Sequence, residues 1–203
     1  MFHLVQSLYN NYTQTATYNV LLLGLDNAGK SSLLESIKSK FLKSYNPPKR
    51  ILPTVGQNVS TIPLPLSKDK IALKFWDVGG QDQLRELWDF YYPQAHAILF
   101  VVDTNDPDRI EECKKVIQQI VMNDATEGVV IVIVGNKMDI DTPKRLGIVE
   151  LKECVNPLFE HLNAKVSRVV MISAITGEGV PEVVEWVGNA VVKNKDIRKP
   201  RMV

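Results

Sequence analysis

Apolar and polar residues alternate along this chain with two different periods. Continuous apolar runs predict six strands, near 18–24, 58–66, 70–77, 97–103, 129–135 and 167–172. Apolar residues spaced three or four positions apart predict helices near 30–43, 82–92, 108–122, 144–162 and 179–193. Because strands and helices alternate, we expect an α/β fold with an open sheet and helices on both faces.

Two kinds of strand are expected in this sheet. Residues 97–103 and 129–135 are apolar at nearly every position, which is typical of parallel strands covered on both faces. Residues 58–66 contain two prolines, which cannot donate hydrogen bonds to a neighbouring strand. This segment therefore belongs at an edge, in a hairpin with 70–77. The prediction is a six-stranded, mostly parallel sheet with one antiparallel edge strand.

A glycine-rich loop follows the first strand. Residues 24–31 have the sequence Gly-Leu-Asp-Asn-Ala-Gly-Lys-Ser, which fits the phosphate-binding pattern G-x-x-x-x-G-K-[ST]. Backbone N–H groups and the helix N-terminus would face the phosphate oxygens. Lys30 would reach the β- and γ-phosphates, and the Ser31 hydroxyl would bind Mg²⁺. An ordinary glycine-rich turn is the alternative, which the flanking strand and helix disfavour. The predicted phosphate contacts are Gly24, Asp26, Asn27, Ala28, Gly29, Lys30, Ser31 and Ser32.

Two further loops, each at the end of a strand, indicate the base. The Asp139 carboxylate can accept two hydrogen bonds from guanine, whereas adenine lacks both donors and would leave the carboxylate unpaired. Lys137 would lie along the base plane, and the Ala174 N–H would meet the guanine oxygen. A helix-capping loop is the alternative for 136–139 alone. The predicted base contacts are Asn136, Lys137, Asp139, Ser173, Ala174 and Ile175.

The end of the 70–77 strand indicates magnesium binding and hydrolysis. Asp77 can hold Mg²⁺ through its water shell, because Mg²⁺ keeps several waters. The Gly80 N–H can approach the γ-phosphate, and Gln81 can orient an attacking water. Thr54 offers a second hydroxyl to the metal, although alone it would be an ordinary turn residue. We therefore expect GTP or GDP with Mg²⁺, bound at Ser31, Thr54 and Asp77 (through water), and catalytic roles for Gln81, Thr54 and Gly80.

Size and composition exclude several classes of protein. The 203 residues are enough for one domain with a full core, and a net charge of +1 does not indicate a nucleic-acid partner. Cys113 and Cys154 are expected to be reduced thiols of a cytoplasmic monomer. No apolar run approaches the ~18 residues of a membrane span, and the N-terminus does not have the pattern of a secretory signal.

The two ends of the chain differ from its centre. Residues 1–12 place seven apolar side chains on one helical face, which predicts a helix lying in a bilayer interface. Permanent docking of this helix on the domain is the alternative. The helix has no Lys or Arg, so its anchorage is expected to be marginal and reversible. We predict a membrane-contacting helix and linker over 1–17, a nucleotide-binding domain over 18–193, and a basic, disordered tail over 194–203.

A basic stretch lies between the phosphate loop and the hairpin. Residues 36–68 contain six basic residues and no acidic one. The stretch could face acidic lipid or an acidic partner, and a solvated basic loop is the alternative.

Four motifs together resemble a known family. They are Gly-Leu-Asp-x-Ala-Gly-Lys at 24–30, Pro-Thr-Val-Gly at 53–56, Trp-Asp-Val-Gly-Gly-Gln at 76–81 and Leu-Arg-x-Leu-Trp at 84–88. They are similar to the Arf and Arf-like small GTPases over essentially the whole chain after residue 17. The resemblance implies a P-loop small G domain that acts as a membrane-traffic switch, with exchange factor, GTPase-activating protein and effectors supplied in trans. It also implies that the 58–77 hairpin shifts on GTP binding and displaces the N-terminal helix.

Departures from the Arf pattern point to one branch of the family. Phe2 stands where N-myristoylation needs glycine. Gln57 replaces the phenylalanine that, with aromatic residues matching Trp76 and Tyr91, forms the effector-reading surface of Arf proteins. With Met1-Phe2 and long stretches near 40–50 and 63–70, the chain is most similar to the Arf-related branch of the Golgi. There, an acetylated N-terminal methionine is read by an integral membrane receptor.

The arginines of the sequence bear on the rate of hydrolysis. The nearest arginine before Thr54 is Arg50, and nothing positions it. We therefore expect slow intrinsic hydrolysis of ~10⁻⁴ s⁻¹, which an arginine in trans would raise by ~10³–10⁵.

Three alternative functions stay open at this point. A phosphotransferase would need an acceptor site and lid arginines, which the sequence does not indicate. The second alternative is a module that holds GTP without regulated turnover. The third is an Arf-like protein that acts at another membrane.

Overall fold

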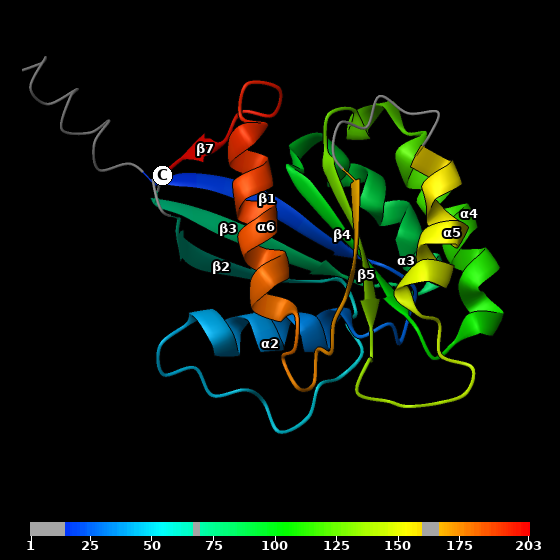
Figure 1. Cartoon of the computed structure of the whole chain (residues 1–203). Coiled ribbons are helices and arrows are strands. Elements are labelled where there is room, and N and C mark those ends of the chain that lie inside the picture. The colour runs from blue at the N-terminus through cyan, green and yellow to red at the C-terminus, as the bar shows by residue number, and fades with distance from the viewer. Residues whose placement is uncertain (1–14, 67–69, 160–166) are drawn as a thin grey trace, which may run out of the picture.

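The computed structural model describes residues 15–66, 70–159 and 167–203. Its centre is a twisted sheet in the order β2-β3-β1-β4-β5-β6, with the short β7 paired to β1 (Figure 1). The strands are β1 (Ala16–Leu23), β2 (Gln57–Pro65), β3 (Lys70–Val78), β4 (Ala97–Asp103), β5 (Val130–Asn136), β6 (Ser167–Met171) and β7 (Arg201–Met202). The β2–β3 and β1–β7 pairs are antiparallel and the others parallel. The predicted fold class is confirmed, and β7 is added to the six predicted strands.

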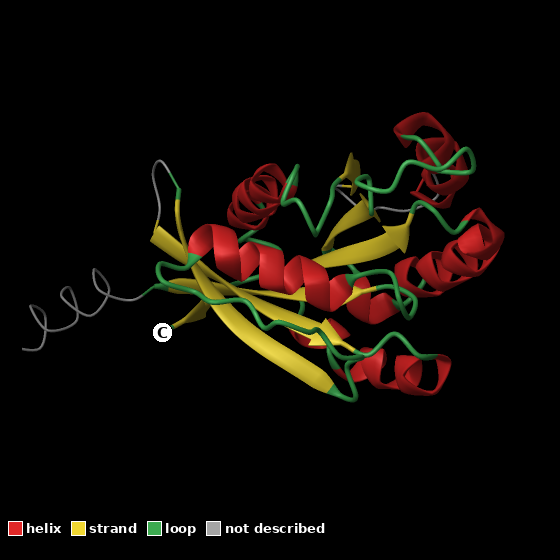
Figure 2. Cartoon of the chain, turned by 90° about the horizontal axis from the view of Figure 1, so that it is seen from below, coloured by secondary structure: helices red, strands yellow, loops and turns green. Residues whose placement is uncertain are grey.

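Helices cover both faces of this sheet (Figure 2). The longer ones are α2 (Lys30–Phe41), α4 (Ile110–Val121), α5 (Ile148–Phe159) and α6 (Val180–Lys193). The apolar sides of α2 and α6 pack on one face of the sheet, and those of α4 and α5 pack on the other. Val20 and Leu22 of β1 point into the first core, whereas Leu21 and Leu23 point into the second. Burial on both faces explains why the central strands β4 and β5 are apolar at nearly every position.

Two of the predicted helices have different bounds in the structure. The helix predicted over 82–92 is wrong: α3 (Asp82–Arg85) ends after one turn and is followed by the 3-10 helices η1 (Glu86–Phe90) and η2 (Tyr92–Gln94). Trp88 belongs to η1, and its buried indole donates to the Gly79 carbonyl. Pro93 lies in η2. These anchors favour tight turns over a continuous α-helix.

The helix predicted over 144–162 begins later, at Ile148. Residues 145–147 have no regular structure and follow a turn at 143–144. The Arg145 N–H donates to the Thr142 carbonyl and the Leu146 N–H to the Thr104 carbonyl, which replaces the hydrogen bonds of a helix. Residues 160–162 of the predicted helix lie outside the described residues.

The prediction of a disordered tail over 194–203 is also wrong. Thr15 and Val203 exchange backbone hydrogen bonds, which extends the β1–β7 pairing to the end of the chain. β4 pairs β1 only from Val20 onward, so the start of β1 has a free edge that β7 fills. The Arg198 guanidinium donates to the carbonyls of Pro93, Ala125 and Glu127. Basic composition predicted solvation, whereas backbone pairing orders the tail.

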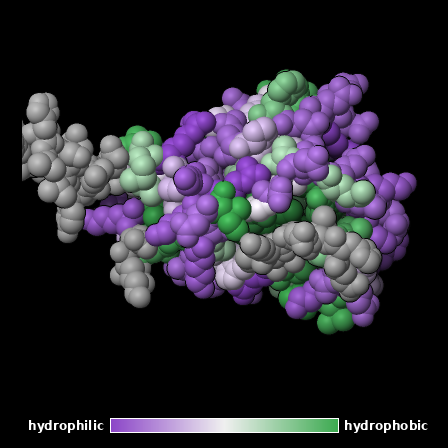
Figure 3. All heavy atoms as spheres, turned by 90° about the horizontal axis from the view of Figure 1, so that it is seen from above, coloured by the Kyte–Doolittle hydropathy of each residue, from purple (hydrophilic) through white to green (hydrophobic). Residues whose placement is uncertain are grey.

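The face of the molecule that is seen from above Figure 1 is largely hydrophilic, with apolar residues in patches between polar ones (Figure 3). Among the described residues, no helix is long and apolar enough to span a bilayer. Cys113 and Cys154 are free thiols, as predicted.

Candidate nucleotide-binding site

The candidate site lies at the carboxyl ends of the parallel strands. The loop after β1 and the segments 51–54 and 79–81 line a cavity of about 320 Å³. Loops after β5 and β6 lie beside it, because parallel strands carry their following loops to the same edge of the sheet. The phosphate loop and the base loops, which lie more than a hundred residues apart in the sequence, are therefore neighbours.

The phosphate loop owes its shape to glycine at two places. Gly29 has φ +93°, and a Cβ there would lie 2.4 Å from the Asn136 Nδ2. Gly80 approaches from the end of β3, and a Cβ on it would lie 2.2 Å from the Lys30 Nζ and 2.3 Å from the Gly24 carbonyl oxygen. Backbone alone can come so close to the centre of the loop. The resulting space between bare backbone segments suits a phosphate chain.

Lys30 supplies the charge at the centre of this loop. Its side chain is buried, and its Nζ donates to the carbonyls of Gly24 at 2.9 Å and Leu25 at 2.8 Å. Burial lowers the pKa of the Lys30 ammonium to about 8, against the opposing effects of Asp77 and Asp26. The lysine is therefore still mostly protonated at pH 7, and phosphate oxygens are stronger acceptors for it than the loop carbonyls are.

Three oxygen-bearing side chains meet next to Lys30. The Ser31 Oγ donates to the Asp77 Oδ2 at 2.7 Å, and the Thr54 Oγ1 donates to the same oxygen at 3.1 Å. The two hydroxyl oxygens are 2.9 Å apart. These residues come from α2, from the segment before β2, and from the end of β3, so the fold brings the predicted metal ligands together.

The other oxygen of Asp77 tests whether a cation fits here. Asp77 is fully buried, and its Oδ1 has no hydrogen-bond partner among the described residues. An unpaired buried carboxylate oxygen is costly. A hydrated Mg²⁺ would supply water O–H donors to it, and hydroxyl and carboxylate oxygens are the ligands that Mg²⁺ prefers. The residues present therefore fit Mg²⁺.

Asn58 is a neighbour of this cluster that the sequence analysis missed. It pairs with Asp77 in the β2–β3 register, and its Nδ2 lies 3.4 Å from the Asp77 Oδ2 and 3.5 Å from the Thr54 Oγ1. Its place in the hairpin, opposite the acid, is the signal that could have found it.

Asn136 connects the phosphate loop to the base loops. Its buried amide donates from Nδ2 to the Ala28 carbonyl and accepts at Oδ1 from the Ala174 N–H, both at 2.9 Å. A guanine oxygen can therefore use the Ala174 N–H, as predicted, only by sharing or replacing this bond.

Two carboxylates fix the remaining base residues. The Ser173 Oγ donates to the Asp139 Oδ1 at 2.6 Å and accepts from the Thr176 N–H at 3.0 Å, which orients the exposed Asp139 side chain. The Lys137 Nζ pairs with the Asp103 Oδ2 at 2.5 Å. Asp103 at the end of β4 is a second missed residue, whereas Ile175, predicted as a base contact, is 74% exposed.

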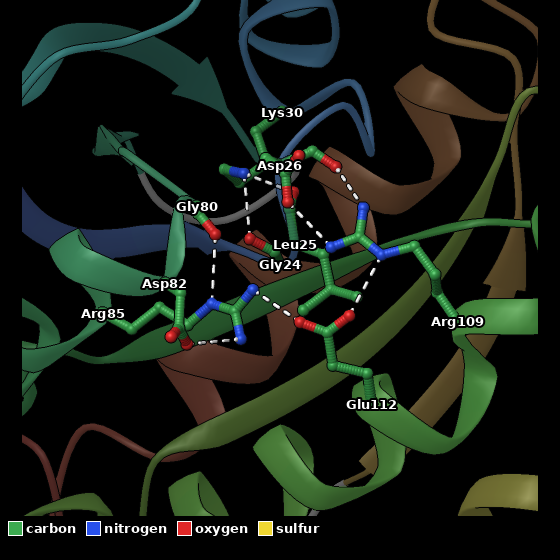
Figure 4. A network of polar contacts seen from close by, with 9 residues as sticks. All are labelled: Gly24, Leu25, Asp26, Lys30, Gly80, Asp82, Arg85, Arg109 and Glu112. Carbon is green, nitrogen blue, oxygen red and sulfur yellow. Dashed lines mark hydrogen bonds and ion pairs between the residues drawn. The ribbon is translucent and has the colours of Figure 1, made fainter.

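Gln81 is among the residues that line the cavity, and it is exposed to solvent. The next turn carries Arg85, whose Nε donates to the Gly80 carbonyl at 3.1 Å. Arg85 also takes part in an ion-pair network that reaches the phosphate loop, and the sequence analysis did not find it (Figure 4).

Comparison with known proteins decides the family. The model of the ADP-ribosylation factor family, Arf, matches residues 4–191. The chain belongs to the Arf family. The resemblance that the four sequence motifs indicated is thereby confirmed.

Individual relatives of the family match over nearly the full length. The chain is 46% identical over 200 residues to ADP-ribosylation factor-like protein 3 of Saccharomyces cerevisiae, with 98% of each chain covered. It is 36% identical over 203 residues to ADP-ribosylation factor-related protein 1 of Homo sapiens, covering 99% of this chain and 98% of that one.

A solved structure is similar as well. The Arl6 BBS3 small GTPase from Trypanosoma brucei, with bound nucleotide analogue GppNp, superposes with a TM-score of 0.72 at 26% identity, over 88% of this chain and 99% of that one. Arf-family proteins bind guanine nucleotide, hydrolyse GTP and work with regulators and effectors. This chain is therefore an Arf-like small GTPase, as predicted.

Proposed function

We propose that this GTPase cycles between GDP- and GTP-bound forms at Golgi membranes and recruits effectors that regulate vesicle traffic. The main support for a nucleotide-dependent switch is that the side chains of Ser31, Thr54 and Asp77 meet at one point. Thr54 belongs to the long connection between α2 and β2. A group on such a connection can be held by the metal and the terminal phosphate together and released when that phosphate leaves.

Magnesium would be held by the Ser31 and Thr54 hydroxyls, with Asp77 contacting it through water. The ion would neutralise charge on the β- and γ-phosphates. Lys30 would leave the loop carbonyls and donate to the same phosphates. The phosphate loop, with contacts from Gly24, Asp26, Asn27, Ala28, Gly29 and Ser32, would bind the rest of the chain of phosphates.

Guanine would be selected by Asp139. The Ser173 hydroxyl occupies one oxygen of this carboxylate and fixes its direction, which leaves acceptor capacity for the two donors of guanine. An adenine at this position would leave that capacity unpaired. Asn136, Lys137 and the 173–175 loop would form the walls around the base.

Gln81 would orient the attacking water for hydrolysis. Its amide oxygen would accept a hydrogen bond from the water, whose oxygen would form a bond to the γ-phosphorus while the bond to the β,γ-bridging oxygen breaks. The proton of the water would pass to the phosphate that is released. The Gly80 N–H and Lys30 would stabilise charge on the transferred group. No arginine is among the described residues that line the cavity, so we expect slow turnover until an activating protein supplies one.

Membrane contact would come from the N-terminal segment. Residues 1–14 lie outside the described residues, so their amphipathic pattern stays a prediction, as do acetylation of Met1 and recognition by an integral membrane receptor. The exposed side chains of Lys40, Lys43, Lys49 and Arg50 support contact of the 40–50 loop with an acidic surface. The Golgi assignment rests on Met1-Phe2 and the two long stretches.

Effector choice is expected to differ from that of Arf proteins. Trp76 and Tyr91 lie with ring centroids 5.8 Å apart, on strand β3 and beside η1, while Gln57 at the start of β2 is exposed. An exposed amide at position 57 offers hydrogen bonds to an effector where a phenylalanine ring would offer apolar contact.

Flotation with Golgi membranes tests this function. The full chain and a chain lacking residues 1–12 are each loaded with GDP or with a non-hydrolysable GTP analogue. We expect only the full chain with the analogue to float. The Ser31→Asn variant, a control with weakened Mg²⁺-GTP binding, should stay largely unbound. Equal flotation in both nucleotide states would contradict the switch, and flotation without residues 1–12 would contradict the anchor.

A further inference from the structure

Four charged side chains of alternating sign connect the phosphate loop to the turn before Gln81 (Figure 4). The Arg109 Nη2 bonds the Asp26 Oδ1 at 2.7 Å, and its Nε bonds the Glu112 Oε2 at 3.0 Å. The other oxygen of Glu112 accepts from the Arg85 Nη2 at 2.8 Å. The residues lie in the phosphate loop, in η3 (Pro107–Arg109), in α4 and at the end of α3.

The last bond of this series reaches the peptide that precedes Gln81. The Arg85 Nε donates to the Gly80 carbonyl at 3.1 Å, and this carbonyl belongs to the bond that joins Gly80 to Gln81. On its other side, Gly80 lies against the Lys30 Nζ and the Gly24 carbonyl. The direction in which Gln81 leaves the turn is therefore set by contacts from the phosphate loop and from Arg85.

Glu112 is the centre of the network. One carboxylate binds two guanidinium groups through different oxygens, and each guanidinium reaches on to a different loop. Hydrogen bonds from Arg109 and Arg85 hold the pKa of Glu112 below its usual value, so the carboxylate is charged at neutral pH. The Arg85 side chain is only 13% exposed, and its Nη1 also pairs with the Asp82 Oδ1 at 3.3 Å. Asp82 is 92% exposed and Glu112 is 40% exposed, so Glu112 is the better shielded partner of the guanidinium.

We propose that Glu112 is a positioning residue for GTP hydrolysis, which holds Arg85 on the Gly80 carbonyl and Arg109 on the phosphate loop. Gln81 and the phosphates then keep a fixed relation, which a water-orienting residue requires. The inference rests on the proposed role of Gln81. Glu112 is not among the described residues that line the cavity, so it acts through Arg85 and Arg109.

The planar geometry of the Arg85 guanidinium is important for this network. Arg85 uses one nitrogen for the carbonyl and another for the carboxylate, and a planar fork of fixed donors can do both at once. A lysine ammonium has donors around a single nitrogen and is not pre-organised for two acceptors on different elements. The Arg85→Lys variant should therefore lose the positioning while it keeps the charge.

The adjacent residue provides a matched control for the test. Glu111 is also on α4, its side chain is 70% exposed, and among the described residues its one ion-pair partner is Lys114 of the same helix. We compare Glu112→Gln with Glu111→Gln in the full chain, by single-turnover hydrolysis of bound GTP with and without cell extract. Glu112→Gln and Arg85→Lys should each slow hydrolysis about 10-fold, which corresponds to about 1.4 kcal/mol. Glu111→Gln should hydrolyse at the wild-type rate.

Two further measurements separate positioning from a general structural role. The dissociation constant of a GTP analogue and the unfolding midpoint with bound nucleotide should stay near wild type in Glu112→Gln. The Trp88 indole N–H donates to the Gly79 carbonyl at 3.0 Å, so its NMR resonance reports on the turn directly. That resonance should shift in Glu112→Gln and stay in place in Glu111→Gln.

The outcomes distinguish this proposal from the one on which it rests. If Gln81→Leu hydrolyses GTP at the wild-type rate, the assigned role of Gln81 fails. If Gln81→Leu is slow but Glu112→Gln is as fast as wild type, the positioning role of Glu112 is overturned while that of Gln81 stands. A Glu112→Gln variant that loses nucleotide affinity as much as rate would also overturn it, because the residue would then only maintain the fold.

Discussion

The two ends of the central sheet use polar groups in opposite ways. At the carboxyl ends of the strands, Asp77 has a buried oxygen without a hydrogen-bond partner among the described residues. There Lys30 donates to backbone carbonyls, which are weaker acceptors for an ammonium group than phosphate oxygens are. At the other end, Arg198 satisfies the carbonyls of three residues. There the buried His96 accepts from the Asn19 N–H and bonds the Lys199 carbonyl, both at 2.9 Å.

This difference separates binding from stability. A polar group without a hydrogen-bond partner raises the free energy of the empty site, and this free energy is recovered when a ligand supplies the partner. At the opposite end, the hydrogen bonds of Arg198 and His96 connect elements of the fold to one another. Substitutions at the first end should therefore change nucleotide affinity, and substitutions at the second should change the free energy of unfolding.

The largest effect is expected for Asp139→Asn. An amide has donors where guanine also has donors, so GTP affinity should fall by ~10³ or more while affinity for xanthosine triphosphate rises. Competition titration against a fluorescent GTP measures both. Asp141→Asn, two residues on and 94% exposed, is the matched control and should bind like wild type. Retained guanine selectivity in Asp139→Asn would place the base elsewhere.

Ser31→Asn should weaken Mg²⁺-GTP by about 100-fold and GDP by much less, because it removes one metal ligand that matters most when the terminal phosphate is present. Dissociation rates of labelled GDP and of a GTP analogue measure this difference. The exposed Ser39 on the same helix gives the control, Ser39→Asn. Equal losses for the two nucleotides would argue against Ser31 as a metal ligand.

At the opposite end, Arg198→Ala should lower the free energy of unfolding by about 2 kcal/mol and leave the dissociation constant for GTP unchanged. The loss follows from three carbonyls that no longer receive their donors. Arg201→Ala, which removes a single long contact to the Gln94 Oε1 at 3.5 Å, should change stability by less than about 0.5 kcal/mol. Denaturant titration with bound nucleotide gives both values. A stable Arg198→Ala variant with weakened nucleotide binding would reverse the comparison.

The smallest effect is a pH dependence at His96. Burial lowers the pKa of His96, and the nearby Arg198 and Arg201 lower it further. Below the ordinary value of 6.5 the unfolded chain gains a proton before the folded chain does, so stability is complete above that pH and falls as the pH drops below it. Unfolding titrations from pH 7.5 to 5.5 should show a fall smaller than that of Arg198→Ala, and His96→Gln should reduce it. A pH-independent stability of the wild type would contradict the neutral, bridging imidazole.

Much of this architecture is predictable because its causes are local. The phosphate loop is one contiguous motif, and the strands β4 and β5 are apolar at nearly every position because both of their faces are buried. The tail was mispredicted because β7 is only two residues long and its partner β1 lies at the other end of the chain. Glu112 was missed for a similar reason, since its partners at 85 and 109 look like ordinary surface arginines until the fold joins them.

Magnesium dependence of GTP binding tests the central claim most directly. The full chain, freed of nucleotide, is titrated calorimetrically with a non-hydrolysable GTP analogue, once in Mg²⁺ and once in a chelator, beside the Asp77→Asn variant. The wild type should bind one analogue per chain and lose about 100-fold in affinity without the metal, whereas Asp77→Asn should bind weakly and nearly equally in both buffers. Wild-type binding that is indifferent to Mg²⁺, or no binding heat in either buffer, would contradict the assignment of this end of the sheet.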